Sequence, residues 1–510
     1  MESESLRAGA VPAERVDGGE LGKLHRSAGE SGAPGLERLF FFDAEECDYE
    51  ISEITGAIPE WLSGSYYVNG PARFELGGLR YRNWLDGDGM IQALHFKQGR
   101  AHFVSRFVRT RKFIAESEAG RFLYRTFGTA FERDRLRRNV MLEPPVNVSV
   151  YPYAGTLLAF GEQALPVELD AHTLVTRGEF DFRSALNEIS PFAAHPKIDP
   201  TSGHLVNFGM SFSPTQSVLN LYEFDHNASL SRRFRHRLPL AYSMHDFAMT
   251  PHYAVFFLSP LLLRFERLRQ EGTPLIDSLS WEPKRGSNIL IVPRAKTSEE
   301  PKLVAAGERC CLHFINCFEE GSKLSVDIIE LDAPLYPNYQ PMPDLFVNVS
   351  PGRPMRYRVD LEDQRVVDRI PLAFDRTPDF PAMNTCLHGQ FYDEFWVLGL
   401  AHSGEPGRKF FDELAHLRWR EPAVGDTYRV SAGEYLAGEP IVIEDTNGSS
   451  RTRVLIVERI DTRNNSCSFL IFDAGEVSRG PLAQLQLKHR IHPGFHASWQ
   501  ESRGPSSGTS

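Results

Sequence analysis

The chain has 510 residues, of which 41% are hydrophobic, and a formal net charge of −11. This length allows two or three domains or one large β domain such as a propeller. The net negative charge argues against a nucleic-acid partner. The sequence contains no apolar run of about 18 residues, so no membrane-spanning helix is expected.

Both ends of the chain have the composition of unstructured segments. Residues 1–37 are rich in Gly, Ala, Ser, Glu and Arg without apolar periodicity, and the last residues contain a Gly-Pro-Ser-Ser-Gly run. We therefore expect a disordered segment over 1–37, one ordered domain over 38–499 and a flexible tail over 500–510. No signal peptide is evident, and none of the six cysteines forms a CxxC pair. A cytoplasmic protein with reduced thiols is expected.

Between these ends, short apolar runs alternate with turn residues. Residues 90–96 and 101–108 read as two strands joined by the turn Lys97-Gln98-Gly99-Arg100. The same pattern recurs at residues 155–160, 253–258, 288–292, 324–329, 395–399 and 454–457. It predicts an all-β sandwich, barrel or propeller, and a single closed propeller suits the length best. No clear internal repeat is present, so periodicity does not predict the number of blades.

Two segments depart from the strand pattern. Residues 112–139 lack Pro and place aromatic residues at helix-like spacing, which predicts one or two helices. Residues 260–268 mix leucines with charged residues and predict a buried helix. For both segments the alternative is an apolar surface that dips into a membrane.

Four histidines lie in apolar or aromatic surroundings far apart in the sequence. They are His195, His245, His313 and His496. One such histidine is usually a core residue, but four favour a centre built from separate elements. Structural zinc sites often contain thiolates, whereas four imidazoles on a six-coordinate Fe(II) leave room for dioxygen or substrate. Copper or zinc would accept the same donors, so the residues leave the metal open.

Several local motifs resemble a known superfamily. They are Tyr67-Val68-Asn69-Gly70-Pro71, Trp84-Leu85-Asp86-Gly87-Asp88-Gly89-Met90, Ala194-His195-Pro196-Lys197, Met244-His245-Asp246-Phe247-Ala248-Met249-Thr250, His313-Phe314-Ile315-Asn316-Cys317-Phe318-Glu319-Glu320 and Gly494-Phe495-His496. In this order they make residues 38–499 resemble the carotenoid cleavage oxygenases. That superfamily includes carotenoid and apocarotenoid dioxygenases, stilbene-cleaving enzymes and a retinoid isomerase.

The resemblance implies a seven-bladed β-propeller with a cap of helices and loops over an axial iron site. It implies that the four histidines named above are the Fe²⁺ ligands, and that carboxylates accept the N–H groups of three of them. Glu162 and Glu439 match two of these carboxylates. Asp379 stands where the family usually has a third glutamate. Because Asp is one methylene shorter, it must come closer to its histidine or act through water.

The resemblance further implies a non-heme iron dioxygenase that splits a C=C bond of an apolar polyene into two carbonyl products. Phe103 replaces a tyrosine that binds the phenol in stilbene-cleaving relatives, which favours a carotenoid or apocarotenoid. Phe103 and Phe314 are expected to line the substrate tunnel. Stilbene-type cleavage, an isomerase or isomerohydrolase, and a non-catalytic carotenoid binder remain alternatives. Peripheral membrane contact is expected near residues 113–131 and Leu261–Leu263.

Overall fold

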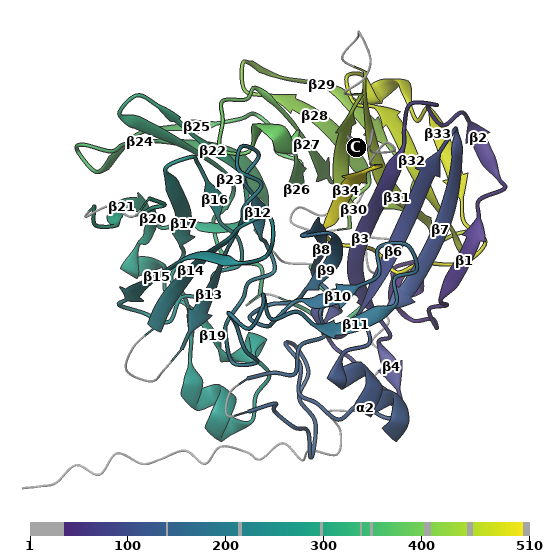
Figure 1. The fold of residues 1–510 in the computed structure, drawn as a ribbon, viewed down its shortest axis with the longest axis horizontal. Coiled ribbons are helices and arrows are strands. Elements are labelled where there is room, and N and C mark those ends of the chain that lie inside the picture. The colour runs from purple at the N-terminus through teal and green to yellow at the C-terminus, as the bar shows by residue number, and fades with distance from the viewer. Residues whose placement is uncertain are drawn as a thin grey trace, which may run out of the picture.

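The computed structural model describes residues 35–138, 141–212, 217–295, 299–336, 339–346, 350–401, 410–445 and 452–502. Within these residues, seven antiparallel sheets of four or five strands form a ring (Figure 1). Two further two-stranded hairpins lie outside the ring. The all-β class and the seven-bladed propeller are therefore confirmed.

Five of the blades are each made from one continuous stretch of chain. From the innermost strand outward, blade 2 comprises β8 (Ser149–Tyr153), β9 (Thr156–Phe160), β10 (Val167–Leu169) and β11 (Thr176–Glu179). Blade 3 comprises β12 (Lys197–Ile198), β13 (Leu205–Ser211), β14 (Ser217–Phe224) and β15 (Leu230–Leu238). Blade 4 comprises β16 (Ala248–Met249), β17 (Tyr253–Leu258), β20 (Ser287–Pro293) and β21 (Lys302–Gly307). Blade 5 comprises β22 (Cys310–Glu320), β23 (Lys323–Leu331), β24 (Gly352–Asp360) and β25 (Arg365–Pro371). Blade 6 comprises β26 (Asp379–Ala382), β27 (Glu394–Gly399), β28 (Glu413–Arg418) and β29 (Glu421–Arg429).

The two remaining blades combine strands from both ends of the chain, which closes the ring. Blade 1 comprises β34 (Ala497–Glu501), β3 (Gly64–Ala72), β6 (Asp88–Lys97), β7 (Arg100–Phe107) and β1 (Cys47–Glu50). Blade 7 comprises β30 (Glu434–Glu444), β31 (Arg453–Asp461), β32 (Ser466–Asp473), β33 (Ala483–Gln486) and β2 (Ile54–Gly56). The N-terminal and C-terminal strands consequently lie side by side in Figure 1. Closure in this way leaves fewer unpaired strand edges.

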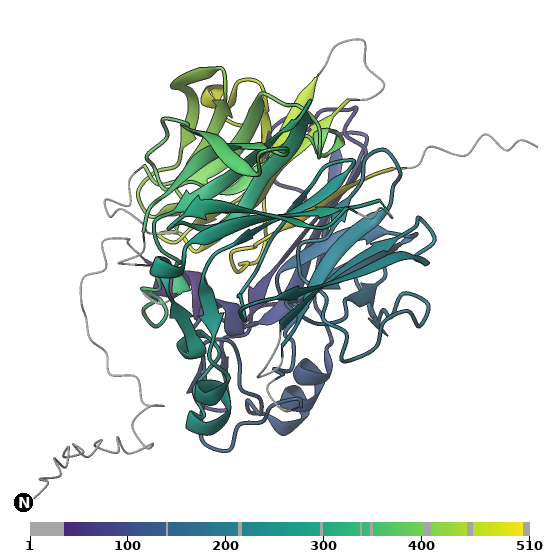
Figure 2. The same ribbon diagram turned by 90° about the vertical axis from the view of Figure 1, so that its left-hand side faces the viewer.

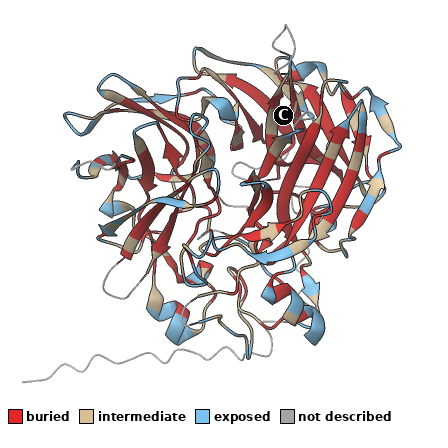
Figure 3. Ribbon diagram, viewed as in Figure 1, coloured by how far each residue is buried: buried red, intermediate tan, exposed pale blue. Residues whose placement is uncertain are grey.

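The hydrophobic core lies between the blades. Strand β3 is buried along its whole length, whereas the outer strand β15 alternates exposed and partly buried residues. Figure 3 shows the same gradient, with buried residues concentrated in strands near the centre of the ring. Strands covered on both faces need apolar side chains at successive positions, which explains continuous runs such as residues 253–258.

Among the described residues, the longest helix lies at one end of the ring, which we call the cap, and it is shorter than predicted. Helix α2 (Arg111–Ala119) begins where the Thr110 side chain accepts the N–H of Phe113, and ends at Gly120 with φ +60°. The prediction of helix over residues 112–139 is wrong beyond Ala119 among the described residues of that range. The segment after Gly120 is irregular and is held by an ion pair between Arg125 and Asp134 at 2.8 Å.

The prediction of a buried helix over residues 260–268 is also wrong. Leu261–Leu263 form strand β18, which pairs with β19 (Leu279–Trp281), and a short π-helix, η2 (Arg267–Glu271), follows. The three leucines are buried and pack against neighbouring apolar side chains, so they do not form the exposed lip considered above. Figures 1 and 2 place α2 and η2 at the same end of the ring.

The remaining elements are short. They are α1 (Glu37–Phe40), the hairpin β4 (Glu75–Leu76) and β5 (Leu79–Arg80), and the 3-10 helices η1 (Trp84–Asp86), η3 (Ile276–Ser278), η4 (Pro283–Arg285), η6 (Thr385–Leu387) and η7 (Val477–Arg479). Residues 1–34 of the expected disordered segment lie outside the described residues. Residues 503–510 of the expected tail lie outside them too. Among the described residues, no helix is long and apolar enough to cross a membrane.

Candidate metal centre

Each of the four histidines lies at the inner edge of a different blade. His195 precedes β12 of blade 3, and His245 precedes β16 of blade 4. His313 lies within β22 of blade 5, and His496 immediately precedes β34 of blade 1. Because the innermost strands surround the axis of the ring, these positions bring distant parts of the sequence together.

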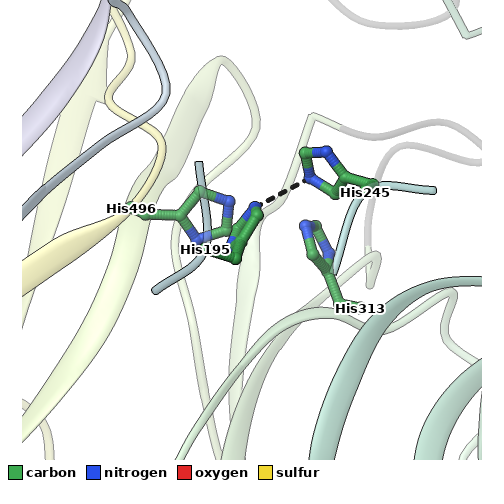
Figure 4. A group of neighbouring side chains, drawn as sticks. All are labelled: His195, His245, His313 and His496. Carbon is green, nitrogen blue, oxygen red and sulfur yellow. Dashed lines mark hydrogen bonds between the residues drawn. The ribbon is translucent and has the colours of Figure 1, made fainter. Parts of the chain in front are cut away.

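The four imidazoles meet at one point. One nitrogen from each histidine lies within 4.8 Å of the others, and Figure 4 shows the rings converging from separate segments. The Nε2 atoms of His195 and His245 are 2.9 Å apart. We call this group the four-histidine cluster. It is the arrangement that the resemblance implied for these residues.

The three blades without a cluster histidine each supply a carboxylate. Glu162 follows β9 of blade 2, Asp379 begins β26 of blade 6, and Glu439 lies in β30 of blade 7. Their oxygens lie 2.6 Å from His245 Nδ1, 2.6 Å from His313 Nδ1 and 3.2 Å from His496 Nδ1, respectively. The shorter Asp379 thus reaches its histidine directly, and not through water.

These contacts determine which imidazole nitrogen faces the centre. A carboxylate at Nδ1 accepts the ring N–H, so Nε2 carries a lone pair and can bind a metal. Nε2 of His313 is buried and has no hydrogen-bond partner among the described residues. An unpaired buried nitrogen is costly unless something binds it. The donor set therefore fits a divalent transition metal.

The pKa values differ across the cluster. Burial, followed by the neighbouring imidazoles, holds the pKa of His195 well below its usual value. Burial also lowers the pKa of His496, although Glu439 opposes it. Burial lowers the pKa of His245 too, but Glu162 and other carboxylates outweigh it and the net pKa is raised. His195 and His496 are thus neutral donors near pH 7, and a proton competes with the metal more strongly at His245 than at these two.

Irregular backbone geometry aims several of these side chains. The register of β22 shifts on both sides of Phe314, next to His313, and β26 shifts between Asp379 and Ala382. Phe380 adopts the left-handed region with φ +49°, which is uncommon for a bulky residue. Bulges of this kind re-aim side chains beside functional sites. The bulge in β26 brings the short Asp379 side chain within reach of His313.

One aspartate joins three of the histidine-bearing segments. Asp246, which follows His245, forms an ion pair with Lys197 at 2.8 Å. Its other oxygen accepts the backbone N–H of Phe314 at 2.9 Å. Asp246 is buried, and the net pKa of its carboxyl is lowered because Lys197 and the hydrogen bonds outweigh burial. Sequence reasoning gave this residue no role, although Asp246 and Lys197 stand beside the candidate ligands.

The two predicted tunnel residues are both buried. Phe103 is fully buried on β7 and packs against Tyr49 and Phe469 in the blade core. Phe314 belongs to the apolar cluster that joins blades 4 and 5. The aromatic residue that does flank the cluster is Phe380, whose ring centroid lies 5.2 Å from that of His496. In the sequence, the only signal that Phe380 flanks the cluster was its position directly after Asp379.

A cavity of about 330 Å³ lies in the cap. Segments of the cap that are distant in sequence line it, including Arg82, Arg267 and Tyr336. Tyr336 lines this cavity, and burial, followed by the negative charge of Glu162, Cys310 and Asp379, raises the pKa of Tyr336.

Comparisons with known proteins give matches along most of the chain. The profile described as retinal pigment epithelial membrane protein matches residues 40–501. The chain is 29% identical to the apocarotenoid-15,15'-oxygenase of Synechocystis sp., with 90% of this chain and 94% of the relative covered. It is 28% identical to an isoeugenol monooxygenase of Pseudomonas nitroreducens, with 89% and 95% covered. The crystal structure of cobalt-substituted Synechocystis apocarotenoid oxygenase superposes with a TM-score of 0.85 at 27% identity, covering 92% of this chain and 98% of that one.

Proposed function

Because the chain belongs to the retinal pigment epithelial membrane protein family, we propose that it is a non-heme Fe(II) dioxygenase that cleaves a C=C bond of a carotenoid or apocarotenoid. The observation that carries the proposal is the four-histidine cluster, with carboxylates on three of its imidazoles. When bound there, Fe(II) supplies the activation of dioxygen. The overall reaction is RCH=CHR′ + O₂ → RCHO + R′CHO, which requires no net proton transfer.

The side chains of this protein hold and orient the four imidazoles and shield the cluster. Three carboxylates keep the Nδ1 protons of His245, His313 and His496 in place, which directs the lone pairs of Nε2 toward the metal. Phe380 covers the cluster beside His313 and His496. The pair formed by His245 and Glu162 retains 19% and 37% side-chain exposure, against 6% and 7% for His313 and Asp379. The pair formed by His245 and Glu162 is therefore the more exposed of these two.

The test is reconstitution with Fe(II) without oxygen, followed by reaction with ¹⁸O₂ and a panel of carotenoids, apocarotenals and stilbenes. We expect about one iron per chain and one labelled oxygen atom in each carbonyl product. Geometric isomers without cleavage would establish an isomerase instead, and stoichiometric binding without turnover would establish a carrier. Label in only one of the two products would indicate monooxygenation.

Substitutions connect this activity to the cluster. His313→Ala should abolish both iron binding and cleavage, because it removes a donor and the imidazole that the buried Asp379 contacts at 2.6 Å. His204→Ala is the matched control. His204 also pairs with a carboxylate, Glu223 at 3.1 Å, but lies outside the cluster. Full iron content in His313→Ala would contradict the assignment of this residue as a ligand.

A further inference from the structure

We propose that Glu458 is a positioning residue for the metal centre, because its carboxyl anchors the backbone segment that carries His496. This inference rests on the proposed function, since His496 is one of the four imidazoles that would hold the iron. Glu458 does not belong to the four-histidine cluster, so it acts on the cluster only through the neighbouring backbone.

Three successive backbone N–H groups anchor the segment 494–496, which ends in His496. In chain order, they donate to Glu458 Oε2 at 2.8 Å, to the Asn69 carbonyl at 2.7 Å and to the Val148 carbonyl at 3.2 Å. These acceptors belong to β31 of blade 7, to β3 of blade 1 and to the residue directly before β8 of blade 2. The acceptor on β31 is the only side chain of the three, so it is the anchor that a substitution can remove.

Two glycines let the carboxyl of Glu458 lie against the backbone on both sides of the His496–Glu439 contact. A Cβ at Gly494 would lie 2.7 Å from Glu458 Oε1 and 3.0 Å from Oε2. A Cβ at Gly438, which has φ +69°, would lie 3.3 Å from Glu458 Cδ. Gly438 directly precedes Glu439, the carboxylate that contacts His496. One buried side chain therefore packs beside both the ligand and the carboxylate that orients it.

The backbone links these two segments directly. The Gly438 N–H donates to the Gly494 carbonyl at 3.1 Å, and the Glu439 N–H donates to the Phe495 carbonyl at 2.6 Å. The contact between Glu439 and His496 Nδ1 is 3.2 Å, the longest of the three carboxylate contacts at the cluster. This length is at the upper end of the range for such hydrogen bonds, so a small displacement of the segment 494–496 would break the contact.

The carboxyl of Glu458 costs stability at this position. Glu458 is fully buried, Oε2 accepts one recorded hydrogen bond, and Oε1 has no recorded partner among the described residues. A buried polar oxygen without a partner costs free energy, and an apolar side chain of similar size would avoid that cost. The hydrogen bond from Gly494 is the recorded interaction that an apolar side chain would lose. Holding the segment 494–496 is therefore the role that accounts for a carboxyl here.

The experiment titrates the metal-free protein with Co(II) and follows its visible absorption, which depends on the geometry of the ligands. Glu458→Met keeps the size of the side chain but removes the acceptor, so the spectrum should shift and the affinity should fall about tenfold. Glu458→Gln keeps an oxygen that can accept the Gly494 N–H. It should restore the wild-type spectrum, with an affinity within about threefold of wild type. Glu458→Asp, whose carboxyl is one methylene shorter, is the second variant and should shift the spectrum as Glu458→Met does.

Glu413→Met is the matched control. Glu413 is also a fully buried glutamate, on β28 of blade 6, where Oε1 accepts from Arg429 at 3.1 Å and Oε2 has no recorded partner among the described residues. Its loss should lower the unfolding midpoint and leave the Co(II) spectrum unchanged. An unchanged spectrum and affinity in Glu458→Met, or the same spectral shift in Glu413→Met, would overturn the positioning role.

The metal titration also separates this inference from the proposed function, because it needs neither dioxygen nor a substrate. A Co(II) spectrum that depends on Glu458, in a protein whose iron-loaded form cleaves no alkene, would refute the proposed function and uphold the positioning role. Cleavage by the wild type, with kcat and the Co(II) spectrum unchanged in Glu458→Met, would refute the positioning role and uphold the proposed function.

Discussion

At the scale of single residues, Asp379 shows how this chain adapts a family position. The side chain lacks one methylene relative to glutamate, yet its oxygen lies 2.6 Å from His313 Nδ1. The left-handed conformation of Phe380 and the register shift in β26 accompany this close approach. Sequence comparison identified the departure, whereas its compensation depends on backbone geometry that the residue types do not reveal.

Asp379→Asn should lower metal affinity about 10- to 100-fold, because a neutral amide cannot stabilise the His313 N–H as a carboxylate does. Asp379→Glu retains the charge and is the control, with an affinity expected within about tenfold of wild type. Titration with Co(II), followed by its visible absorption, measures both. Wild-type affinity in Asp379→Asn would show that the contact does not tune the ligand.

Glu458 is a second residue whose environment matters, because burial raises the pKa of its carboxyl. It is fully buried on β31, where Oε2 accepts the N–H of Gly494 at 2.8 Å and Oε1 has no recorded partner among the described residues. Burial raises its pKa from 4.5 to about 8, and the Gly494 N–H opposes this shift. The folded protein therefore holds a proton here that the unfolded chain releases above its ordinary pKa.

This difference predicts how stability depends on pH. Between pH 4.5 and about 8 the folded state binds more protons, so the contribution of Glu458 to the free energy of unfolding falls as pH rises. The loss is on the order of 5 kcal/mol across the window. Glu458→Gln should flatten this part of the curve and stabilise the protein above pH 7. Urea unfolding of the wild type and of Glu458→Gln at pH 5.5, 7 and 8.5 measures the free energy of unfolding as a function of pH. Parallel curves for the two proteins would contradict the pKa shift.

At the scale of elements, the inner strands carry the chemistry and their irregularities direct it. Four blades supply imidazoles and three supply carboxylates, all near the axis. Strand alternation alone does not place these groups, because bulges in β22 and β26 break the regular pairing there. The predicted strands were confirmed, including the hairpin in which Lys97 pairs with Arg100 across its turn. Helices were predicted less well, because cap segments obtain their structure from packing.

The ion pair between Lys197 and Asp246 should stabilise the arrangement of blades 3, 4 and 5. Asp246→Asn keeps an acceptor for the Phe314 N–H but leaves Lys197, which is 20% exposed, without its counter-charge. We expect a loss of about 1–3 kcal/mol in stability and weaker metal binding. A double-mutant cycle with Lys197→Met measures the coupling. Strictly additive effects would show that the pair does not act as a unit.

At the scale of the whole molecule, the fourth histidine depends on closure of the ring. The segment before β34 lies against β3, where the Phe495 N–H donates to the Asn69 carbonyl at 2.7 Å and the Asn69 N–H to the His496 carbonyl at 3.1 Å. This approach requires glycine, since a Cβ at Gly494 would lie 2.6 Å from Val68 Cγ2 and 2.7 Å from Glu458 Oε1.

Gly494→Ala should therefore lower stability by about 1–3 kcal/mol and weaken metal binding together, because overpacking displaces the segment that carries His496. Gly425→Ala is the control. It lies in β29 of blade 6, and a Cβ there meets nothing within 4 Å. Thermal unfolding and metal titration of both variants measure the effects. A destabilised Gly494→Ala with unchanged metal affinity would separate closure of the ring from the metal centre.

The sequence by itself determined the class of fold and the candidate ligands. Strand and turn patterns are local, and the histidine motifs are short, so both can be read from neighbouring residues. The family resemblance supplied the blade number, which periodicity did not. Phe103 and Phe314 are buried among apolar side chains, and their place in a substrate tunnel stays a prediction, because sequence position does not say which face of a strand lines a cavity.

Only the tertiary structure decided how these parts meet. The convergence of the four-histidine cluster, the bridging role of Asp246 and the lining of the cap cavity each join segments that are distant along the chain. Such contacts depend on how the ring closes and how the cap folds over it. Closure brings the first and last strands into one blade, so a site on the axis exists only after the whole chain has folded.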